Sequence, residues 1–435
     1  MNLSIIVLAA GKGTRMNSVK PKVFHEVGNS PMIYHVLQTA EKLSPRSVSL
    51  VISKELFSCK KKISKKFKKI KFIEQKTQLG TANAVAQAVS TNKIADDITL
   101  ILYGDTPLIS AQTIKKCISN FKNKKLDLCV LSMISPVKNH RYGRIILEDG
   151  KLQKIVESIE TNSQQKKINL CNSGVILINS NLLASNIGKI KNHNKKKEYY
   201  FTDIVKIFND QKFKVNHFEC PFYEMIGVNC KKELSIVEMK FQEVIRENFL
   251  KKGVTLIDRD SVFFSHDTII GKDVIIYPNV YLGKNVKIGN NVKIKSFCHI
   301  DNTIIKNNIE VGPFARLRDN VFIDSGSKIG NFVEIKKSDI KKDVKISHLS
   351  YIGDAQIGDY TNIGAGMITC NFDGKKKNKT IIGDNCFIGS NTSLIAPIQV
   401  KDNSLIGAGT VADKDVPTQT IVYRKSELVK KMKKS

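Results

Sequence analysis

The carboxyl-terminal half of this chain carries aliphatic residues at every sixth position, and this interval limits the folds that it can adopt. Neither an α-helix nor an alternating strand repeats at this interval. Hexapeptide repeats do, because each side of a parallel β-helix turns one aliphatic side chain per coil into the core. Three runs share the interval: Ile270, Ile276, Leu282, Ile288, Ile294 and Ile300; Val311, Leu317, Ile323, Ile329 and Ile335; and Ile382, Ile388, Leu394, Val400 and Ile406. We therefore expect a parallel β-helix over residues 253–435.

Two irregularities interrupt the repeat. The stretch Thr369–Thr380 is too polar and too rich in lysine to form a coil, so we expect it to loop out of the stack. The interval also shortens by one residue near Ile305, Ile340 and Ile357, for which the sequence alone gives no reason.

The first 230 residues alternate short apolar runs with helical patterns, which is typical of a mostly parallel sheet with crossover helices. The expected strands are Ser4–Ala9, Ser47–Ile52, Ile98–Tyr103, Leu128–Ile134 and Gly174–Ile178. Several end in loops with Gly, Asp or Asn, and open α/β sheets bind ligands beyond the carboxyl ends of their strands. This predicts a Rossmann-like α/β domain over residues 1–230 with its site at that edge.

Between Lys231 and Lys252, apolar residues recur at helical spacing without proline or glycine. These residues are Leu234, Val237, Phe241, Val244, Ile245 and Phe249. We expect one linker helix over residues 231–252 that connects the two domains.

Length and composition fit two domains in a reducing compartment. A chain of 435 residues exceeds the size at which one hydrophobic core usually stops growing. No apolar run approaches the ~18 residues of a membrane-spanning helix, and no basic region precedes the first apolar stretch as in a secretory signal. Nine cysteines are scattered without a Cys-x-x-Cys pair. We expect a soluble, cytoplasmic protein without membrane insertion.

The net charge of +30 raises the question of a nucleic-acid partner, because clustered Lys and Arg release counterions from phosphate backbones. The lysines are spread, and runs such as Lys60–Lys62, Lys65–Lys69, Lys195–Lys197 and Lys375–Lys377 lack interleaved aromatic residues. We expect a solvated basic surface, small anionic substrates and no nucleic acid. A basic nucleic-acid scaffold stays open as another class, which salt-sensitive binding to DNA or RNA without enzymatic turnover would indicate.

A glycine-containing segment, Leu8–Met16, follows the first expected strand, and Pro21-Lys22 comes soon after. Small residues at a strand end let backbone N–H groups approach a phosphate, while Arg15 and Lys22 can neutralise a triphosphate and its leaving pyrophosphate. The spacing fits neither a P-loop nor the dinucleotide fingerprint, whose third glycine is replaced by Met16.

This segment resembles the signature of sugar-1-phosphate nucleotidyltransferases. Further motifs follow in the order seen in the bifunctional N-acetylglucosamine-1-phosphate uridylyltransferase/glucosamine-1-phosphate N-acetyltransferase family: Gln75, Gly80-Thr81, Tyr103-Gly104-Asp105, Tyr142-Gly143, Glu157, Asn172 and Gly227-Val228-Asn229. The resemblance covers nearly the whole chain and implies that the β-helix is left-handed. It also implies nucleotide-binding and sugar-binding residues: Leu8, Ala9, Ala10, Gly11, Lys22, Gln75, Gly80, Thr81, Tyr103, Gly104, Gly143, Glu157 and Asn172, with Asp105 and Asn229 as Mg²⁺ ligands.

These residues suit the transfer of a uridylyl group. An oxygen of the sugar phosphate attacks the α-phosphorus of UTP, so catalysis consists mainly of positioning and of charge cancellation by Mg²⁺ and by the cations Arg15 and Lys22. Mg²⁺ prefers oxygen ligands, which the Asp105 carboxylate and the Asn229 amide can provide alongside phosphates and water. No side-chain nucleophile is required.

Four motifs of the repeat region match the same family: Gly312–Arg318, Gly330–Lys337, His348–Asp354 and Asn362–Gly366. An amine attacks a thioester only when neutral, so a base must lie within hydrogen-bond reach, and histidine suits this task near neutral pH. We expect His348 to be the base and Glu334 to orient it. By resemblance, the acetyl acceptor glucosamine-1-phosphate is bound by Arg318, Lys336, Tyr351 and Asn362, and acetyl-CoA by Ala365, Asn371, Phe372, Ser390, Ala408 and Arg424.

The family usually has tyrosine where Phe372 stands, so one hydroxyl contact with the coenzyme is absent, and the stretch after Arg424 is short. The resemblance implies that glucosamine-1-phosphate is acetylated and then converted by UTP to UDP-N-acetylglucosamine and pyrophosphate, for cell-envelope polysaccharides such as peptidoglycan and lipopolysaccharide. It also implies a homotrimer with acetyltransferase sites between subunits. The alternative is a single-activity sugar-1-phosphate nucleotidyltransferase with a structural β-helix tail.

Overall fold

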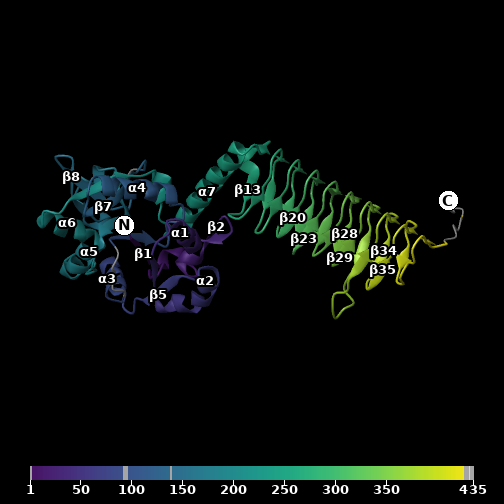
Figure 1. Ribbon diagram of the computed structural model, residues 1–435, viewed down its shortest axis with the longest axis horizontal. Coiled ribbons are helices and arrows are strands. Elements are labelled where there is room, and N and C mark those ends of the chain that lie inside the picture. The colour runs from purple at the N-terminus through teal and green to yellow at the C-terminus, as the bar shows by residue number, and fades with distance from the viewer. Residues whose placement is uncertain (1, 92–96, 138–139, 426–430, 432–435) are drawn as a thin grey trace. The chain divides into compact units, whose positions relative to one another are not determined.

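The chain forms two compact units, Met1–Phe241 and Gln242–Ser435, each with its own core (Figure 1). The computed structural model describes residues 2–91, 97–137, 140–425 and 431. The division between the units falls inside helix α7 (Lys231–Lys251), which occupies the range where the sequence predicts a linker helix. None of the described helices is both long and apolar enough to cross a membrane.

Unit 1 is built on a sheet of nine strands. Its main path runs through β11 (Val215–Glu219), β7 (Leu128–Ile134), β10 (Leu170–Asn179), β6 (Ile98–Tyr103), β1 (Leu3–Leu8), β4 (Ser47–Ile52) and β5 (Ile70–Glu74), and the hairpin β8 (Arg144–Glu148) and β9 (Lys151–Val156) joins it beside β10. Among the described strands of this sheet, only β10 and the hairpin are antiparallel to their neighbours. The mostly parallel α/β sheet is thus confirmed, and the strand expected at Gly174–Ile178 is the later part of antiparallel β10.

Helices cover both faces of this sheet because its central strand is buried on both sides. Ile5 and Val7 of β1 share one core with α1 (Met32–Glu41), α2 (Lys60–Lys66) and α4 (Ala111–Asn123). Ile6 and Leu8 share the opposite core with α3 (Thr81–Thr91), α5 (Ser180–Asn186) and α6 (Ile204–Asp210). A parallel strand covered in this way is apolar throughout, so polar chemistry is confined to the loop that follows it. The short hairpin β2 (Glu26–Val27) and β3 (Ser30–Pro31) completes unit 1.

Unit 2 is a parallel β-helix, as predicted, with three sheets that we call faces 1, 2 and 3. Face 1 contains β12 (Thr255–Leu256), β15 (Ile275–Ile276), β18 (Lys293–Ile294), β21 (Glu310–Val311), β24 (Lys328–Asn331), β27 (Lys345–His348), β30 (Asn362–Ile363), β33 (Phe387–Ile388), β36 (Leu405–Ile406) and β38 (Ile421–Val422). Face 2 contains β13 (Val262–Phe264), β16 (Val280–Leu282), β19 (His299–Ile300), β22 (Arg316–Arg318), β25 (Glu334–Lys336), β28 (Tyr351–Gly353), β31 (Ile368–Cys370), β34 (Ser393–Ile395) and β37 (Val411–Ala412). Face 3 contains β14 (Ile269–Ile270), β17 (Lys287–Ile288), β20 (Thr303–Ile305), β23 (Val321–Ile323), β26 (Asp339–Ile340), β29 (Ala355–Ile357), β32 (Thr380–Ile382) and β35 (Ile398–Val400).

The repeat residues of the sequence form one continuous aliphatic core inside these faces. The shortened intervals all fall at the same corner: Ile305, Ile340 and Ile357 are the core residues of face 3 that follow the turn from face 2. The missing residue therefore comes from this corner and not from a strand, so the three faces keep their register.

The lysine-rich insertion leaves the stack between β31 and β32 (Figure 1). It is slightly shorter than the sequence predicts, because Thr369 and Thr380 both belong to strands. The buried Thr369 hydroxyl accepts a hydrogen bond from the Gly353 N–H (2.7 Å), which ties β31 to the preceding coil.

Helix α7 closes the open edge of face 2. The buried Gln242 side chain donates to the carbonyl of Phe264 (2.8 Å) and accepts from its N–H (2.9 Å), and Arg246 Nε donates to the carbonyl of Val262 (2.8 Å). Because β13 is the first strand of face 2, these side chains bond backbone groups that would otherwise lie unpaired at a sheet edge.

We expect Gln242→Leu to lower the free energy of unfolding of unit 2 by about 1–3 kcal/mol, since it leaves buried backbone groups of Phe264 without hydrogen bonds. Calorimetry of the full chain measures this through the transition of unit 2. The matched control is Val244→Ala, an exposed position on the same helix. Equal shifts in both variants would contradict the capping role.

Candidate active sites

The first candidate site lies at the carboxyl ends of β1, β4 and β6. The Gly104 N–H donates to the carbonyl of Leu8 (2.9 Å), and the Ala9 N–H donates to the carbonyl of Val51 (2.8 Å). Gly13 adopts a left-handed conformation (φ 64°), and a Cβ there would come within 2.6 Å of the Lys22 side chain. A Cβ at Gly11 would meet nothing within 4 Å. The loop thus folds back on Lys22 and leaves open space at Gly11.

The predicted nucleotide-binding residues Gln75 and Gly80 meet beside this loop. Gln75 Nε2 donates to the carbonyl of Gly80 (3.2 Å) and to Asn83 Oδ1 (2.9 Å). Gln78, which the sequence analysis did not single out, donates to the carbonyl of Ala10 (2.7 Å). Its side chain therefore joins the two predicted nucleotide-binding segments.

Lys22 lies between the two predicted metal ligands. Its ammonium group contacts the Asp105 carboxylate and donates to Asn229 Oδ1 (3.2 Å). The backbone supports this arrangement, because the Val228 N–H donates to the carbonyl of Asp105 (2.9 Å) and the Asn229 N–H donates to Glu233 Oε2 (2.6 Å). Residues far apart in the sequence thus direct their oxygen atoms at one cation.

These two oxygen donors fit a magnesium ion. Mg²⁺ is commonly held by one or two protein ligands and completes its shell with substrate phosphates and water. The described residues contain no group of three or more His, Cys, Asp or Glu that could hold a metal. A site of this kind therefore depends on the nucleotide for the rest of its ligands.

The predicted sugar-binding residues come from β10 and from loops around the hairpin. The Asn172 N–H donates to the carbonyl of Gly143 (2.9 Å), and Asn172 Oδ1 accepts from the Gly174 N–H (2.9 Å). Glu157 Oε1 accepts from the Thr202 hydroxyl (3.0 Å), and burial raises the pKa of this carboxyl. Gly143 and Asn172 are thus directly linked.

Tyr103 lies between the nucleotide and sugar residues. A Cβ at Gly174 would come within 2.8 Å of its ring, so glycine is needed at this position. Burial, followed by the carboxylates of Glu157 and Asp105, raises the pKa of the Tyr103 phenol, which therefore stays protonated.

Two arginines of unit 1 lie in different surroundings. Arg15, expected to neutralise phosphate, is exposed. Arg144, which the sequence analysis passed over, is buried and donates to the carbonyls of Tyr142 and His140. It forms no ion pair within the described part of the chain, so its side chain holds the loop before Gly143 through backbone carbonyls alone. A sequence does not distinguish such an arginine from one that binds phosphate.

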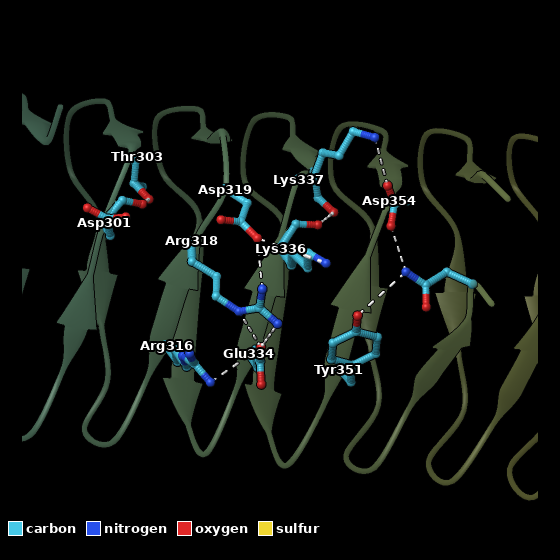
Figure 2. A network of polar contacts seen from close by, with 12 residues as sticks. Asp301, Thr303, Arg316, Arg318, Asp319, Glu334, Lys336, Lys337, Tyr351 and Asp354 are labelled. Carbon is cyan, nitrogen blue, oxygen red and sulfur yellow. Dashed lines mark hydrogen bonds and ion pairs between the residues drawn. The ribbon is translucent and has the colours of Figure 1, made fainter. Parts of the chain in front are cut away.

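The second candidate site lies on face 2, where successive coils stack polar residues in rows. Arg316, Glu334 and Tyr351 are in register, as are Arg318, Lys336 and Gly353. Arg318 donates through Nε (2.8 Å) and Nη2 (2.7 Å) to Oε1 of Glu334 (Figure 2). The predicted acceptor-binding residues Arg318, Lys336 and Tyr351 are therefore brought together.

Asn371 extends this group toward the insertion. Its amide donates to Asp354 Oδ2 (2.7 Å) and to the Tyr351 hydroxyl (3.5 Å). A Cβ at Gly353 would lie within 2.5 Å of that hydroxyl. Phe372 is exposed and forms a bridge with Lys377 at the base of the insertion.

Lys377, which the sequence analysis did not single out, lies at the base of the insertion, where it pairs with Phe372. The nearby Lys377 side chain, with partial desolvation, lowers the pKa of Lys336. Asp373 stiffens the insertion, because its carboxylate accepts from the N–H groups of Lys375 (2.9 Å) and Lys376 (2.8 Å) and from the Asn378 amide (2.8 Å). These bonds lower the pKa of Asp373 to about 2.

Within one chain, His348 and Glu334 have different hydrogen-bond partners. Its Nδ1 lies 2.5 Å from Oδ1 of Asn331, with which it is in register. Glu334 belongs to face 2 and is engaged by Arg318, whereas His348 ends a strand of face 1. Because an amide oxygen only accepts hydrogen bonds, this contact favours the imidazole tautomer that carries its proton on Nδ1.

The remaining candidates lie along face 1. Asn362 is in β30, and Ala365, Ser390 and Ala408 follow face 1 strands in successive coils. Gly364 and Gly389 permit this stack, because a Cβ at either would lie within 2.5 Å of the Ser390 or Ala408 backbone N. Arg424 is exposed beyond β38. Among the described residues, no hydrogen bond or ion pair joins these face 1 candidates or His348 to the face 2 candidates.

Comparison with known proteins covers both units. Residues 4–220 match a model described as nucleotidyl transferase. Residues 267–302 match bacterial transferase hexapeptide repeats, and residues 379–414 match the hexapeptide repeat of succinyl-transferase.

Relatives named "Bifunctional protein GlmU" align along nearly the full chain. The protein of Paramagnetospirillum magneticum is 41% identical over 98% of this chain and 94% of its own length. That of Wolbachia pipientis wMel is 41% identical over 99% of both chains, and that of Cereibacter sphaeroides (strain ATCC 17025) is 39% identical over 99% of this chain and 94% of its own. The motif resemblance is thereby confirmed: the chain belongs to the family of bifunctional GlmU proteins.

Proposed function

We propose that this protein makes UDP-N-acetylglucosamine in two steps. Acetyl-CoA acetylates the amine of glucosamine-1-phosphate, and the resulting N-acetylglucosamine-1-phosphate then displaces pyrophosphate from UTP. The observation that carries the proposal is that each unit gathers one set of family-motif residues, around Lys22 in unit 1 and around Arg318 and Lys336 in unit 2. We assign uridylyl transfer to residues 1–230 and acetyl transfer to residues 253–435, with 231–252 as the linker.

In the uridylyltransferase, Asp105 and Asn229 would hold Mg²⁺, which when bound cancels charge on the triphosphate and the leaving pyrophosphate. The convergence of both oxygens on one ammonium supports this assignment. Lys22 adds a fixed positive charge at the same place. Gly143, Glu157 and Asn172 orient the sugar so that its phosphate oxygen faces the α-phosphorus.

In the acetyltransferase, His348 acts as the general base. The sugar amine attacks the thioester carbonyl, Nε2 of His348 accepts the proton from the amine, and the C–S bond breaks to release CoA, which takes up a proton. The contact between Nδ1 and Asn331 Oδ1 supports this role, because it favours the tautomer that leaves Nε2 free to accept a proton. Arg318, Lys336 and Lys377 supply the positive charge that the sugar phosphate requires.

The oligomeric state, the location and the use of the product that we propose are those implied by the family. We propose a homotrimer, which the division of the acetyltransferase candidates between faces 1 and 2 supports. We propose the cytoplasm as its location, since the substrates are cytoplasmic metabolites. Envelope polysaccharides such as peptidoglycan would consume the product. If acetyl-CoA and glucosamine-1-phosphate released no thiol, the alternative function would hold, namely a single-activity nucleotidyltransferase with a structural β-helix tail.

Asp105→Asn removes one charge from the proposed Mg²⁺ site and should slow uridylyl transfer by about 10²- to 10³-fold. Pyrophosphate release measures this step, and thiol release measures acetyl transfer, which should not change. Asp149→Asn, at an exposed turn of the β8–β9 hairpin, is the control. Parallel loss of both activities in a folded variant would contradict the assignment of one activity to each unit.

His348→Ala should slow acetyl transfer by about 10²- to 10⁴-fold, the usual contribution of a general base. Free CoA release is the readout, and the limb of the pH profile that reports the base should disappear. His299→Ala on β19 removes another exposed imidazole of the β-helix and should have little effect. Near-normal acetylation by the His348 variant would exclude this residue as the base.

Lys377→Met should raise the KM for glucosamine-1-phosphate by about 10- to 100-fold, the range expected for a lost charge-assisted hydrogen bond. The KM for acetyl-CoA should stay constant. Lys376→Met changes the adjacent exposed lysine and serves as the control. The phosphate-binding role would be refuted if both variants raised the KM equally.

A further inference from the structure

Asp354 is a buried carboxylate beside the acetyltransferase candidates, and no step of the proposed reaction uses it. It is 8% exposed and directly follows β28, the strand that carries Tyr351. Its Oδ2 accepts a hydrogen bond from the amide of Asn371 (2.7 Å). Its Oδ1 lies 3.1 Å from the ammonium nitrogen of Lys337, as Figure 2 shows. Because burial removes the water around a carboxylate, it depends on these two donors.

Asp354 also bonds both ends of the lysine-rich insertion. Asn371 lies at the start of the insertion, and the N–H of Thr380 at its end donates to the Asp354 carbonyl (3.2 Å). The two ends are joined as well, because the Asn378 N–H donates to the carbonyl of Asn371 (2.7 Å). The insertion is therefore fixed to the coil of Tyr351 through Asp354.

The carboxylate further determines which way the Asn371 amide points. The oxygen and nitrogen of an amide have nearly the same shape, but a carboxylate without a proton only accepts hydrogen bonds. The amide nitrogen must therefore face Asp354, and Oδ1 points away from it. Gly353 leaves room for this arrangement, because a Cβ there would lie within 2.7 Å of the Asn371 nitrogen.

This orientation leaves one acceptor and one donor available to substrates. Among the described residues, none donates to Asn371 Oδ1, so this atom can accept from an N–H group. The Asn371 nitrogen also donates to the Tyr351 hydroxyl oxygen (3.5 Å), which leaves the hydroxyl hydrogen for another acceptor. An amide N–H of acetyl-CoA suits the first atom, and the phosphate of the sugar suits the second.

We propose that Asp354 is a positioning residue of the acetyltransferase, which holds the Asn371 amide and the Tyr351 hydroxyl in the orientation that binds both substrates. The inference rests on the proposed acetyltransferase function. It connects the coenzyme side of the site with the acceptor side through one buried carboxylate, which itself touches neither substrate.

The test is Asp354→Asn, which keeps the shape of the side chain and suits its left-handed backbone (φ 51°). An amide has one oxygen for the two donors, and the Lys337 ammonium attracts it more strongly than the neutral Asn371 amide does. The new NH₂ group then faces Asn371 and turns its amide over. The kcat/KM for thiol release should fall by about 10- to 100-fold, whereas uridylyl transfer should not change.

The control is Asp343→Asn, which makes the same substitution at an exposed left-handed position (φ 54°) of the β-helix. It should leave thiol release unchanged. An equal loss in both variants would contradict a specific role for Asp354.

Lys337→Met distinguishes positioning from a purely structural role. Without the ammonium, the substituted amide at position 354 can present its oxygen to Asn371. In the Lys337→Met background, Asp354→Asn should therefore lower kcat/KM by less than about 3-fold. A carboxylate that serves only the stability of the coil would cause the same loss in both backgrounds, and that result would overturn the proposal.

The same assays separate this inference from the proposed function. A parent protein that releases thiol, with Asp354→Asn equally active, would refute the positioning role and leave the acetyltransferase standing. A parent that releases no thiol from acetyl-CoA and glucosamine-1-phosphate would refute the proposed function, and the positioning role with it.

Discussion

Register between coils is the constraint on which the acetyltransferase side of this molecule depends. Parallel pairing places each residue directly over its equivalent in the neighbouring coil, about 4.8 Å away, so residues far apart in sequence become neighbours in a row. Arg318 meets Glu334 and His348 meets Asn331 for this reason. The aliphatic core fixes the register, and the shortened turns preserve it because the residue is lost at a corner.

Unit 1 also brings together residues that are far apart in the sequence, but it does so through longer connections. Lys22 follows β1, Asp105 follows β6 and Asn229 precedes α7, yet one ammonium contacts both oxygen-bearing side chains. The parallel strands bring their carboxyl ends to one edge, and the bond from the Val228 N–H to the Asp105 carbonyl fixes the third segment there. The Lys22 ammonium thus holds the two oxygen-bearing side chains at one point.

The sequence was informative where a position repeats or belongs to a motif. The interval of six predicts the β-helix and its core, and the motifs predict the proximity of Lys22, Asp105 and Asn229, as well as that of Arg318, Lys336 and Tyr351. The sequence did not identify residues whose contacts are established only when the chain folds. Lys377 stands in a run of lysines, and only the turn made by Asp373 distinguishes it. Arg144 donates to backbone carbonyls, and Glu334, which we expected to orient His348, accepts from Arg318 within its own chain.

Helix α7 contributes residues to both units, and this determines where the chain can be divided into separate fragments. Glu238 accepts a hydrogen bond from the Gly28 N–H of unit 1, while Gln242 and Arg246, one turn later, bond the first strand of face 2. A fragment that begins at Gly253 would present a bare strand edge to solvent, and such edges recruit strands from other molecules. An excised acetyltransferase, or a gene fusion that exchanges it, would have to retain the second half of the helix to stay free of aggregation.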